Sequence, residues 1–192
     1  MMPNEPSPTP PPSDCRRVVR PGGPDLRVPS AGWLQTVDLI TAIAHLPCAR
    51  WFLSVLVASE LADDLRTPGP WTVLVPTDAA VTRWPGGGRE AIEALFDPDN
   101  AEALIDLAEH HVARGAVRLP RRGPALLATL GGAELRLGPA QAGADHAGLA
   151  PVLRPNLRCR NGVIHLLDAV PAPAWVEASL RARLAPQGLD AA

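Results

Sequence analysis

The sequence predicts a single α+β domain behind a proline-rich segment. Apolar residues recur at helical spacing through residues 33–65 and 97–111, whereas short apolar or β-branched runs bounded by Gly, Pro and Asn follow over residues 112–168. Hydrophobic residues make up 46% of the 192-residue chain and aromatic residues only 4%, so Leu, Val, Ile and Ala must fill the core. A chain of this length favours one domain.

The first thirty residues have the composition of a disordered tail. They hold nine of the 23 prolines, which remove backbone donors and fix φ. We therefore expect residues 1–30 to be extended, with a polyproline docking face at Thr9–Pro12 as the alternative. They contain no apolar run long enough for a signal-peptide core, which predicts a cytoplasmic protein. No stretch elsewhere reaches the length of a membrane span.

The charges of the chain are nearly balanced. Its 18 basic residues are all Arg and face 20 Asp and Glu residues, for a net charge of −2. This balance creates no field that would gather nucleic acid or an anionic membrane, so we expect neither as a partner. Two small arginine clusters can bind an acidic partner or guard solvated strand edges, and the sequence leaves both alternatives open. They are Arg118, Arg121 and Arg122, and separately Arg154, Arg158 and Arg160.

The cysteines predict no disulfide framework. Cys15, Cys48 and Cys159 are widely spaced, and no CxxC pair is present. We expect free thiols, with a bridge between Cys48 and Cys159 left open. A dyad of Cys159 with His165 can be drawn, but a buried inert thiol is the commoner case.

The helices are predicted from apolar spacing and from capping residues. Val37, Ile40 and Ala44 recur at helical spacing behind Thr36, a candidate N-cap. After Pro47, one apolar helix face is formed by Cys48, Trp51, Phe52, Val55 and Leu56, and Leu61 and Leu65 continue into a short third turn. Further helices are expected over Glu90–Leu95, residues 97–111 and Trp175–Leu184. Asp99 and Glu102 form a capping-box-like start for the second of these. The apolar stripe of the last helix should pack over the sheet.

The strands are predicted from short β-branched runs. Trp71–Val75 is apolar on both sides, as a buried strand would be, and Pro76 ends it. Thr77 and Asp78 then open a helix whose unpaired N–H groups their oxygens can accept. Residues 138–150 have the composition of a Gly- and Ala-rich loop. Later strands are expected around Val112, Val117–Leu119, Ala133–Leu137, Val152–Arg154 and Val163–Asp168.

The Asn161-Gly162 pair predicts a tight hairpin before the last strand, because both residues tolerate left-handed backbone. Asp168 should terminate that strand by bonding a neighbouring N–H. His111 lies on an apolar helix face and His165 within an apolar strand, so each imidazole should be buried and bonded to a backbone carbonyl or a hydroxyl. No acid or thiol stands at ligand spacing around the histidines, so we expect no metal and no cofactor.

Three segments together resemble the fasciclin (FAS1) family. TVLVPTDAAV at Thr72–Val81 is similar to its first signature, NGVIHLLDAVPAP at Asn161–Pro173 is similar to its second, and HHVARG at His110–Gly115 resembles the Tyr-His segment between them. The resemblance runs from about Trp33 to Pro173 and implies a β-wedge of short strands with packed helices. Two departures are His110, where the family usually has Tyr, and Val81, where Phe is common.

The resemblance also sets the expected domain organisation and function. We expect a tail at residues 1–30, a FAS1 domain at 31–173, and a C-terminal helix and tail at 174–192. The resemblance implies a binding or adhesion module for protein or cell-surface interaction, which would place the chain at the surface or outside the cell. The sequence has no GxSxG, GxGxxG, GxxxxGK or HExxH motif, which favours a non-enzymatic role. Its Ala-, Arg-, Pro- and Gly-rich composition is typical of GC-rich bacterial genomes.

An intracellular role is the alternative that the resemblance leaves open. Such a protein would bind a small hydrophobic molecule or assist a biosynthetic step such as cyclisation. Its pocket would lie among the helices, with acid–base work falling to His110 or Asp78. The expected lining residues are Trp51, Phe52, Trp84, His110 and His111.

Overall fold

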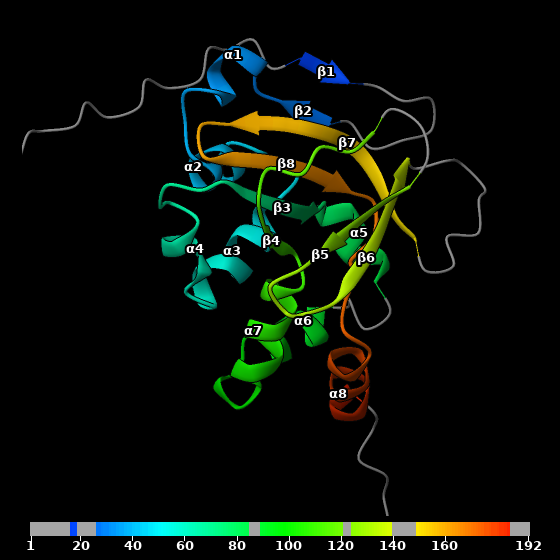
Figure 1. The fold of residues 1–192 in the computed structure, drawn as a ribbon. Helices are drawn as coiled ribbons and strands as arrows, with labels where there is room; N and C mark the ends of the chain where they lie inside the picture. The colour runs from blue at the N-terminus through cyan, green and yellow to red at the C-terminus, as the bar shows by residue number, and fades with distance from the viewer. Residues whose placement is uncertain (1–15, 19–25, 85–88, 121–123, 140–148, 185–192) are drawn as a thin grey trace, which may run out of the picture.

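A computed structural model gives the fold of residues 16–18, 26–84, 89–120, 124–139 and 149–184. The helices are α1 (Ala31–Leu34), α2 (Leu39–Ala44), α3 (Arg50–Ala58), α4 (Leu61–Asp64), α5 (Asp78–Arg83), α6 (Arg89–Leu95), a 3-10 turn (Pro98–Asn100), α7 (Ala101–Glu109) and α8 (Ala174–Leu184). The strands are β1 (Arg16–Val18), β2 (Leu26–Val28), β3 (Trp71–Pro76), β4 (Val112–Arg114), β5 (Ala125–Ala128), β6 (Glu134–Pro139), β7 (Leu149–Cys159) and β8 (Gly162–Leu167). This arrangement confirms the predicted α+β class (Figure 1).

A six-stranded mixed sheet organises the domain, in the order β4-β3-β8-β7-β6-β5. β3 pairs in parallel with β8, with Trp71 opposite Gly162 and Pro76 opposite Leu167. β6 and β7 are also parallel, and the other neighbours are antiparallel. Every residue of β3 and β8 is buried. Strands covered on both faces appear in a sequence as continuous apolar runs, which explains why these two segments are recognisable.

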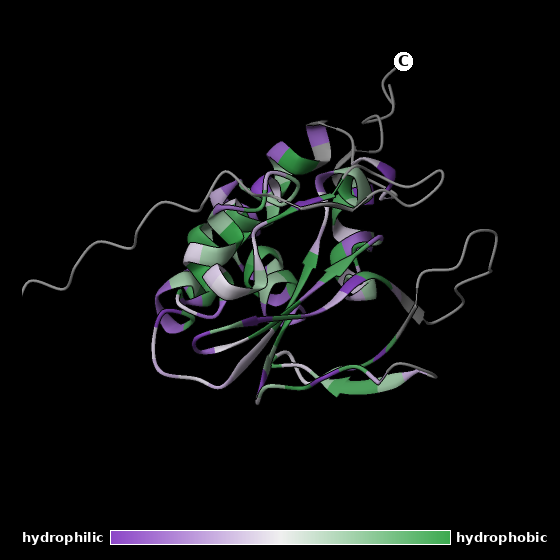
Figure 2. Cartoon of the chain, turned by 90° about the horizontal axis from the view of Figure 1, so that it is seen from above, coloured by the Kyte–Doolittle hydropathy of each residue, from purple (hydrophilic) through white to green (hydrophobic). Residues whose placement is uncertain are grey.

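Two apolar clusters lie on opposite faces of the sheet, because successive side chains of a strand point to opposite sides. Val73 and Val75 of β3 belong to the larger cluster, together with residues from each of the helices α1 to α8. Leu74, between them, belongs to the smaller cluster, with Leu119 and Leu127. Viewed from above, the helices gather on one side of the sheet (Figure 2).

Two strands lie within the segment expected to be a tail. β1 and β2 pair as an antiparallel hairpin, and Leu26 and Val28 of β2 are buried in the larger cluster. Two apolar residues of the segment expected to be an extended tail therefore lie in the core. Residues 1–15 and 19–25 lie outside the described residues.

The helix boundaries differ from the prediction where polar side chains decide them. The helix expected behind Thr36 is α2, and Asp38, rather than Thr36, caps it by accepting from the backbone N of Thr41 at 2.9 Å. A separate short helix, α1, precedes it. The expected capping box before α7 is replaced by a 3-10 turn, in which Asp97 accepts from the backbone N of Asp99 at 2.9 Å. Several Asp and Thr residues at these starts can act as caps, and spacing alone does not choose among them.

The strand prediction missed part of the second half. Val117–Leu119 is not a strand, β5 was not expected, and β7 begins at Leu149, within the segment predicted to be a loop. Residues 140–148 of that segment lie outside the described residues. α8 forms as expected, with Val176 and Leu180 buried, but it packs against α6 and α7 rather than over the sheet. The side chain of Leu184 is not among those described.

The hairpin of β7 and β8 brings Gly162 into direct contact with β3. A Cβ at Gly162 would lie 2.2 Å from the carbonyl oxygen of Trp71 and 2.8 Å from Cδ1 of Leu39. Neither Asn161 nor Gly162 is among the described residues that have positive φ. The expectation of left-handed backbone at this pair is therefore wrong. Gly162 is required because two strands approach closely, not because the turn needs a special φ.

We predict that Gly162→Ala lowers the free energy of unfolding by about 2–4 kcal/mol, because backbone rather than a flexible side chain blocks the added methyl group. Gly32→Ala is the matched control, since its added Cβ would have no heavy atom within 4 Å. The control should change the free energy of unfolding by less than about 1 kcal/mol. Urea denaturation measures both variants, and equal effects would contradict the close contact at Gly162.

Candidate functional site

Thr77 and Asp78, at the end of β3, cap two different helices. Oγ1 of Thr77 accepts from the backbone N of Ala80 at 3.2 Å and so caps α5, as expected. The carboxylate of Asp78 accepts from the backbone N of Trp51 at 3.0 Å and of Arg50 at 3.4 Å. Both donors belong to the first turn of α3, whose own N-cap residue offers no side-chain bond. The predicted role of Asp78 in the following helix is therefore wrong, and its negative charge lies at the N-terminus of α3, where the helix dipole favours it.

Asn161 connects three segments through its side-chain amide. Its Oδ1 accepts from the backbone N of Leu39, at the start of α2, at 2.9 Å. Its Nδ2 donates to the carbonyls of Leu65 and Thr67 at 2.8 and 2.9 Å. Its own carbonyl accepts from the backbone N of Trp71 at 3.1 Å. The residue is thus needed for its hydrogen bonds, which hold the connection between α4 and β3 against the hairpin.

A buried threonine fastens the segment after β4 to the other face of the sheet. Thr72 is fully buried; its Oγ1 donates to the carbonyl of Gly115 at 2.5 Å and accepts from the backbone N of Val117 at 2.9 Å. The carbonyl of Val117 in turn lies 3.0 Å from Nε2 of His165. Both backbone groups of Val117 are therefore bonded to side chains of the two central strands.

His165 and Asn156 complete this attachment. Nδ1 of His165 accepts from the backbone N of Asn156 at 3.1 Å, so Nε2 carries the proton and donates to Val117. Burial lowers the pKa of His165, in agreement with a neutral ring. The side chain of Asn156, which lies at an irregularity in β7 with φ of 62°, bonds both the N–H and the carbonyl of Leu119, at 2.9 and 3.1 Å. Residues 117 and 119 are thus both fixed.

The two adjacent histidines are buried beside the core. His111 is completely buried, with its ring centroid 5.0 Å from that of Phe52 and its Nδ1 2.8 Å from the carbonyl of Leu107. Burial lowers the pKa of His111 to about 3, so the ring is neutral near pH 7. Burial also lowers the pKa of His110, although the nearby Asp106 acts in the opposite direction. Nε2 of His111 has no hydrogen-bond partner within the described part of the chain.

The expected pocket residues pack against one another. The ring of Trp51 lies 6.5 Å from that of Phe52 and 6.4 Å from that of Trp84. Phe52 is fully buried, and Trp84 is buried with its Nε1 donating to Oε1 of Glu177 in α8 at 3.1 Å. His111 extends this row through Phe52. The structure therefore brings the predicted residues together as part of the core.

Asp168 anchors a helix to the end of β8. Its carboxylate pairs with the guanidinium of Arg83, which also donates to the Asp168 carbonyl at 3.0 Å. The backbone N of Asp168 donates to the carbonyl of Pro151 at 2.9 Å. The expected bond from its carboxylate to a neighbouring N–H is replaced by this ion pair with α5.

Cys48 and Cys159 are both free thiols. Burial raises the pKa of Cys48, and it raises the pKa of Cys159 to about 12, so both remain protonated near pH 7. Because both ring nitrogens of His165 bond to backbone groups, the imidazole is not available as a base for Cys159. Cys15 lies outside the described residues.

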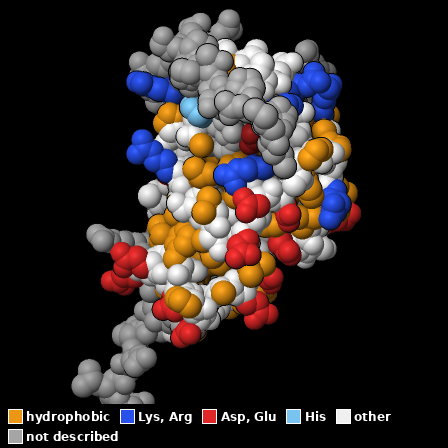
Figure 3. Space-filling view, turned by 90° about the vertical axis from the view of Figure 1, so that its left-hand side faces the viewer, with side chains coloured by type: hydrophobic (Ala, Val, Ile, Leu, Met, Phe, Trp, Pro, Cys, Tyr) orange, Lys and Arg blue, Asp and Glu red, His pale blue; other side chains and the backbone are white. Residues whose placement is uncertain are grey.

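A hollow of about 680 Å³ lies at the turn of the β7–β8 hairpin. Its walls come from residues 66–70, from Ala116 and Arg118, and from residues 158–163. Four arginines line it, and no acidic residue is among the described lining residues; the arginines are Arg66, Arg118, Arg158 and Arg160. On one face of the molecule, arginine side chains lie mainly in the upper half and acidic ones mainly in the lower half (Figure 3).

Only part of this arginine set was evident in the sequence. Arg118, Arg158 and Arg160 were noted there as members of two clusters, whereas Arg66 stands alone in the sequence and joins them only through the fold. Arg154 lines a second hollow of about 460 Å³, formed with residues 28–32, 34, 35 and 156–158, so Arg158 borders both hollows. Arg121 and Arg122 lie outside the described residues.

Among the described residues there is neither a cluster of metal-ligating side chains nor a helix able to span a membrane. Within them, no three or more His, Cys, Asp or Glu side chains gather as ligands for an ion. None of the described helices combines the length and hydropathy that crossing a bilayer requires.

Comparisons with known proteins agree with this fold. Residues 48–173 match the fasciclin domain family. Protein sll1483 of Synechocystis sp. is 29% identical over 140 residues, covering 71% of this chain and 76% of that protein. Protein sll1735 of the same organism is 30% identical over 129 residues, covering 62% of this chain and 84% of that protein. The FAS1 domain pair of the insect cell adhesion molecule fasciclin I is similar with a TM-score of 0.59 and 19% identity over 74% of this chain.

The match from residue 48 to 173 includes both signature segments and every strand of the six-stranded sheet. The chain belongs to the fasciclin family. It spans about half of the fasciclin I domain pair, 53% of that chain, as expected of one FAS1 domain against two.

We predict that Asp78→Ala lowers the free energy of unfolding by about 1 kcal/mol through loss of the α3 cap, and that Asp78→Asn, which keeps an acceptor oxygen, costs less. Asp64→Ala is the control, because Asp64 is exposed. Asp64 accepts a hydrogen bond from Thr67 through its backbone carbonyl, which the substitution keeps. The control should stay within about 0.5 kcal/mol of the wild type. Thermal and urea unfolding measure the three variants. An Asp78→Ala effect no larger than that of Asp64→Ala would refute the capping role.

Proposed function

We propose that this chain is a non-enzymatic binding module that mediates protein interaction at a cell surface. One observation carries the proposal: the polar side chains of the two signature segments, apart from Asp168, bond to the protein's own backbone. Thr77 and Asp78 cap helices, Asn161 bonds three backbone groups, and both ring nitrogens of His165 bond backbone atoms. Polar groups that hold the fold in this way are not free for acid–base chemistry, which leaves the exposed surface for recognition.

The two candidate catalytic residues fit this proposal. The carboxylate of Asp78 is engaged at the N-terminus of α3. His110 is buried, and burial lowers its pKa. Neither residue lines either of the two hollows described above. A general acid and base must reach the same bound substrate, and neither of these two hollows brings both side chains to one.

The small-molecule alternative receives no comparable support. It needs an apolar cavity between the helices, whereas the ring of Trp51 packs in a tilted arrangement against Phe52 and Trp84, and Phe52 packs against His111. The hollow at the hairpin turn is lined by arginines and loop residues. Such a lining suits a charged partner better than a hydrophobic ligand.

Family membership supports the binding role. The structurally similar FAS1 pair comes from a cell adhesion molecule, and adhesion is a function of surfaces rather than of enclosed active sites. A surface role requires that the chain reach the outside of the cell, whereas the small-molecule alternative requires that it stay inside. Location therefore separates the two hypotheses.

We predict that the chain is found at the surface of its native host. Cells are treated with protease while intact, then fractionated, and the chain is detected by antibody in each fraction. Loss of the signal on protease treatment of intact cells, with a cytosolic marker protein preserved as the control, is the expected result. A chain confined to the cytosol and untouched until lysis would overturn the surface role and direct the search to an intracellular ligand.

A further inference from the structure

The arginine-lined hollow has a fixed frame. Arg118 stands between Val117 and Leu119, and side chains bond the N–H and the carbonyl of both neighbours. Arg66 stands between Leu65 and Thr67, whose carbonyls both accept from Asn161. The backbone positions from which these two guanidinium groups extend are therefore held in place, as in a preorganised binding site.

The hairpin positions the other two arginines. Arg158 lies in β7 opposite Val163, and the backbone N of Arg160 donates to the carbonyl of Val37 at 2.8 Å. The hollow therefore collects side chains from three segments that are distant in sequence. Each is attached to the central strands or to the turn before β8 through hydrogen bonds that belong to the fold itself.

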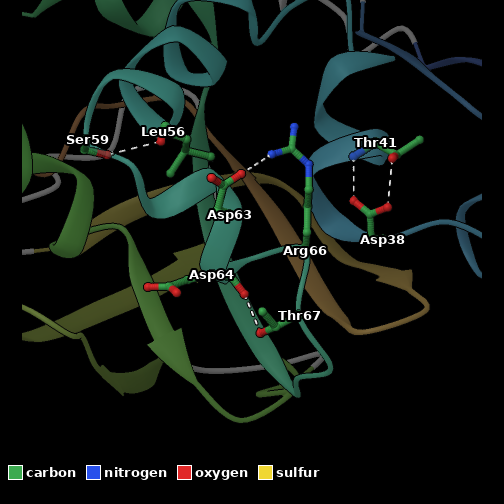
Figure 4. A network of polar contacts seen from close by, with 8 residues as sticks. All are labelled: Asp38, Thr41, Leu56, Ser59, Asp63, Asp64, Arg66 and Thr67. Atoms are coloured by element: carbon green, nitrogen blue, oxygen red, sulfur yellow. Dashed lines mark hydrogen bonds and ion pairs between the residues drawn. The ribbon is translucent and has the colours of Figure 1, made fainter. Parts of the chain in front are cut away.

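The positive charge of this hollow is largely uncompensated. Arg66 pairs with Asp63 at 2.6 Å (Figure 4). Both side chains are more than half exposed. Within the described residues, Arg118, Arg158 and Arg160 have no ion pair, and all three are exposed. Like charges held close together repel one another, so an anionic partner would bind them favourably. The planar guanidinium fork matches the geometry of a carboxylate, which it can bind through two parallel hydrogen bonds.

We propose that this hollow binds an acidic segment of a protein partner, in which two or more Asp or Glu carboxylates pair with Arg66, Arg118, Arg158 and Arg160. The proposal deepens the binding-module function and rests on it. Charge complementarity and the exposure of the arginines favour a segment that docks from outside. Compact phosphate sites usually use the N–H groups of a helix N-terminus, whereas the helix next to this hollow, α4, ends there and presents its carbonyl end.

A direct binding measurement tests the proposal on the purified full chain. Fluorescence anisotropy of a labelled octaglutamate peptide should report binding at low ionic strength that weakens as salt is raised to about 0.15 M. A labelled octalysine peptide is the charge control and should not bind. Unlabelled pyrophosphate is titrated separately to distinguish a phosphate site from a carboxylate site.

Two matched pairs of substitutions locate the site. Arg118→Ser with Arg158→Ser should weaken octaglutamate binding at least about tenfold, since each lost charge-assisted pair contributes on that scale. Arg50→Ser with Arg136→Ser removes the same charge from exposed positions outside the hollow and should change affinity by less than about twofold. Unfolding curves confirm that both variants are folded. Arg118→Lys with Arg158→Lys, which keeps the charge and loses the fork, should weaken binding by an intermediate factor.

The outcomes separate this proposal from the broader function. Octaglutamate binding that is absent, or that falls equally in both Ser pairs, would overturn the site, as would arginine-dependent binding of pyrophosphate without binding of the peptide. Each of these results would leave a surface location of the chain intact. A cytosolic location, conversely, would overturn the surface role without altering the measured affinity for the peptide.

Discussion

The contact between the Asn161-Gly162 turn and the start of β3 is the constraint on which the rest of the fold depends. Gly162 lets β8 lie against the carbonyl of Trp71, while the Asn161 amide bonds backbone groups of α2 and of the connection between α4 and β3. β3 and β8 are fully buried, so a shift in their register would place each buried side chain on the opposite face of the sheet. One turn thus aligns the central strands and joins segments that are distant in sequence.

This constraint divides the polar residues between two tasks. Asn161, Thr72, Asn156 and His165 bond backbone and are partly or fully buried, so they hold the strands and the segment that crosses them. The arginines extend from backbone positions fixed by those bonds and reach solvent. Different side chains therefore stabilise the fold and contact a partner. Surface residues can be substituted while the signature residues keep the fold.

The fold could be predicted where a local pattern is sufficient. The buried strand at Trp71–Val75, the helix face around Phe52 and the cap at Thr77 each depend on neighbouring residues only. Asp78 and Asn161 were recognised as important, but their partners are the first turn of α3 and of α2 and the carbonyls before β3, which no spacing rule connects. Arg66 was missed for the same reason. β5 was missed because ALLA carries no alternating pattern that distinguishes a short strand from a helix turn.

Amide hydrogen exchange at Leu39, in the wild type and in Asn161→Ala, tests this constraint most directly. Leu39 is fully buried and its N–H donates to Oδ1 of Asn161, so the substitution leaves a buried donor without its acceptor and removes the donor to two carbonyls. We expect Leu39 to lose protection and the free energy of unfolding to fall by about 2 kcal/mol or more. Unchanged protection at Leu39, with a free energy of unfolding within about 0.5 kcal/mol of the wild type, would contradict the central role of the turn.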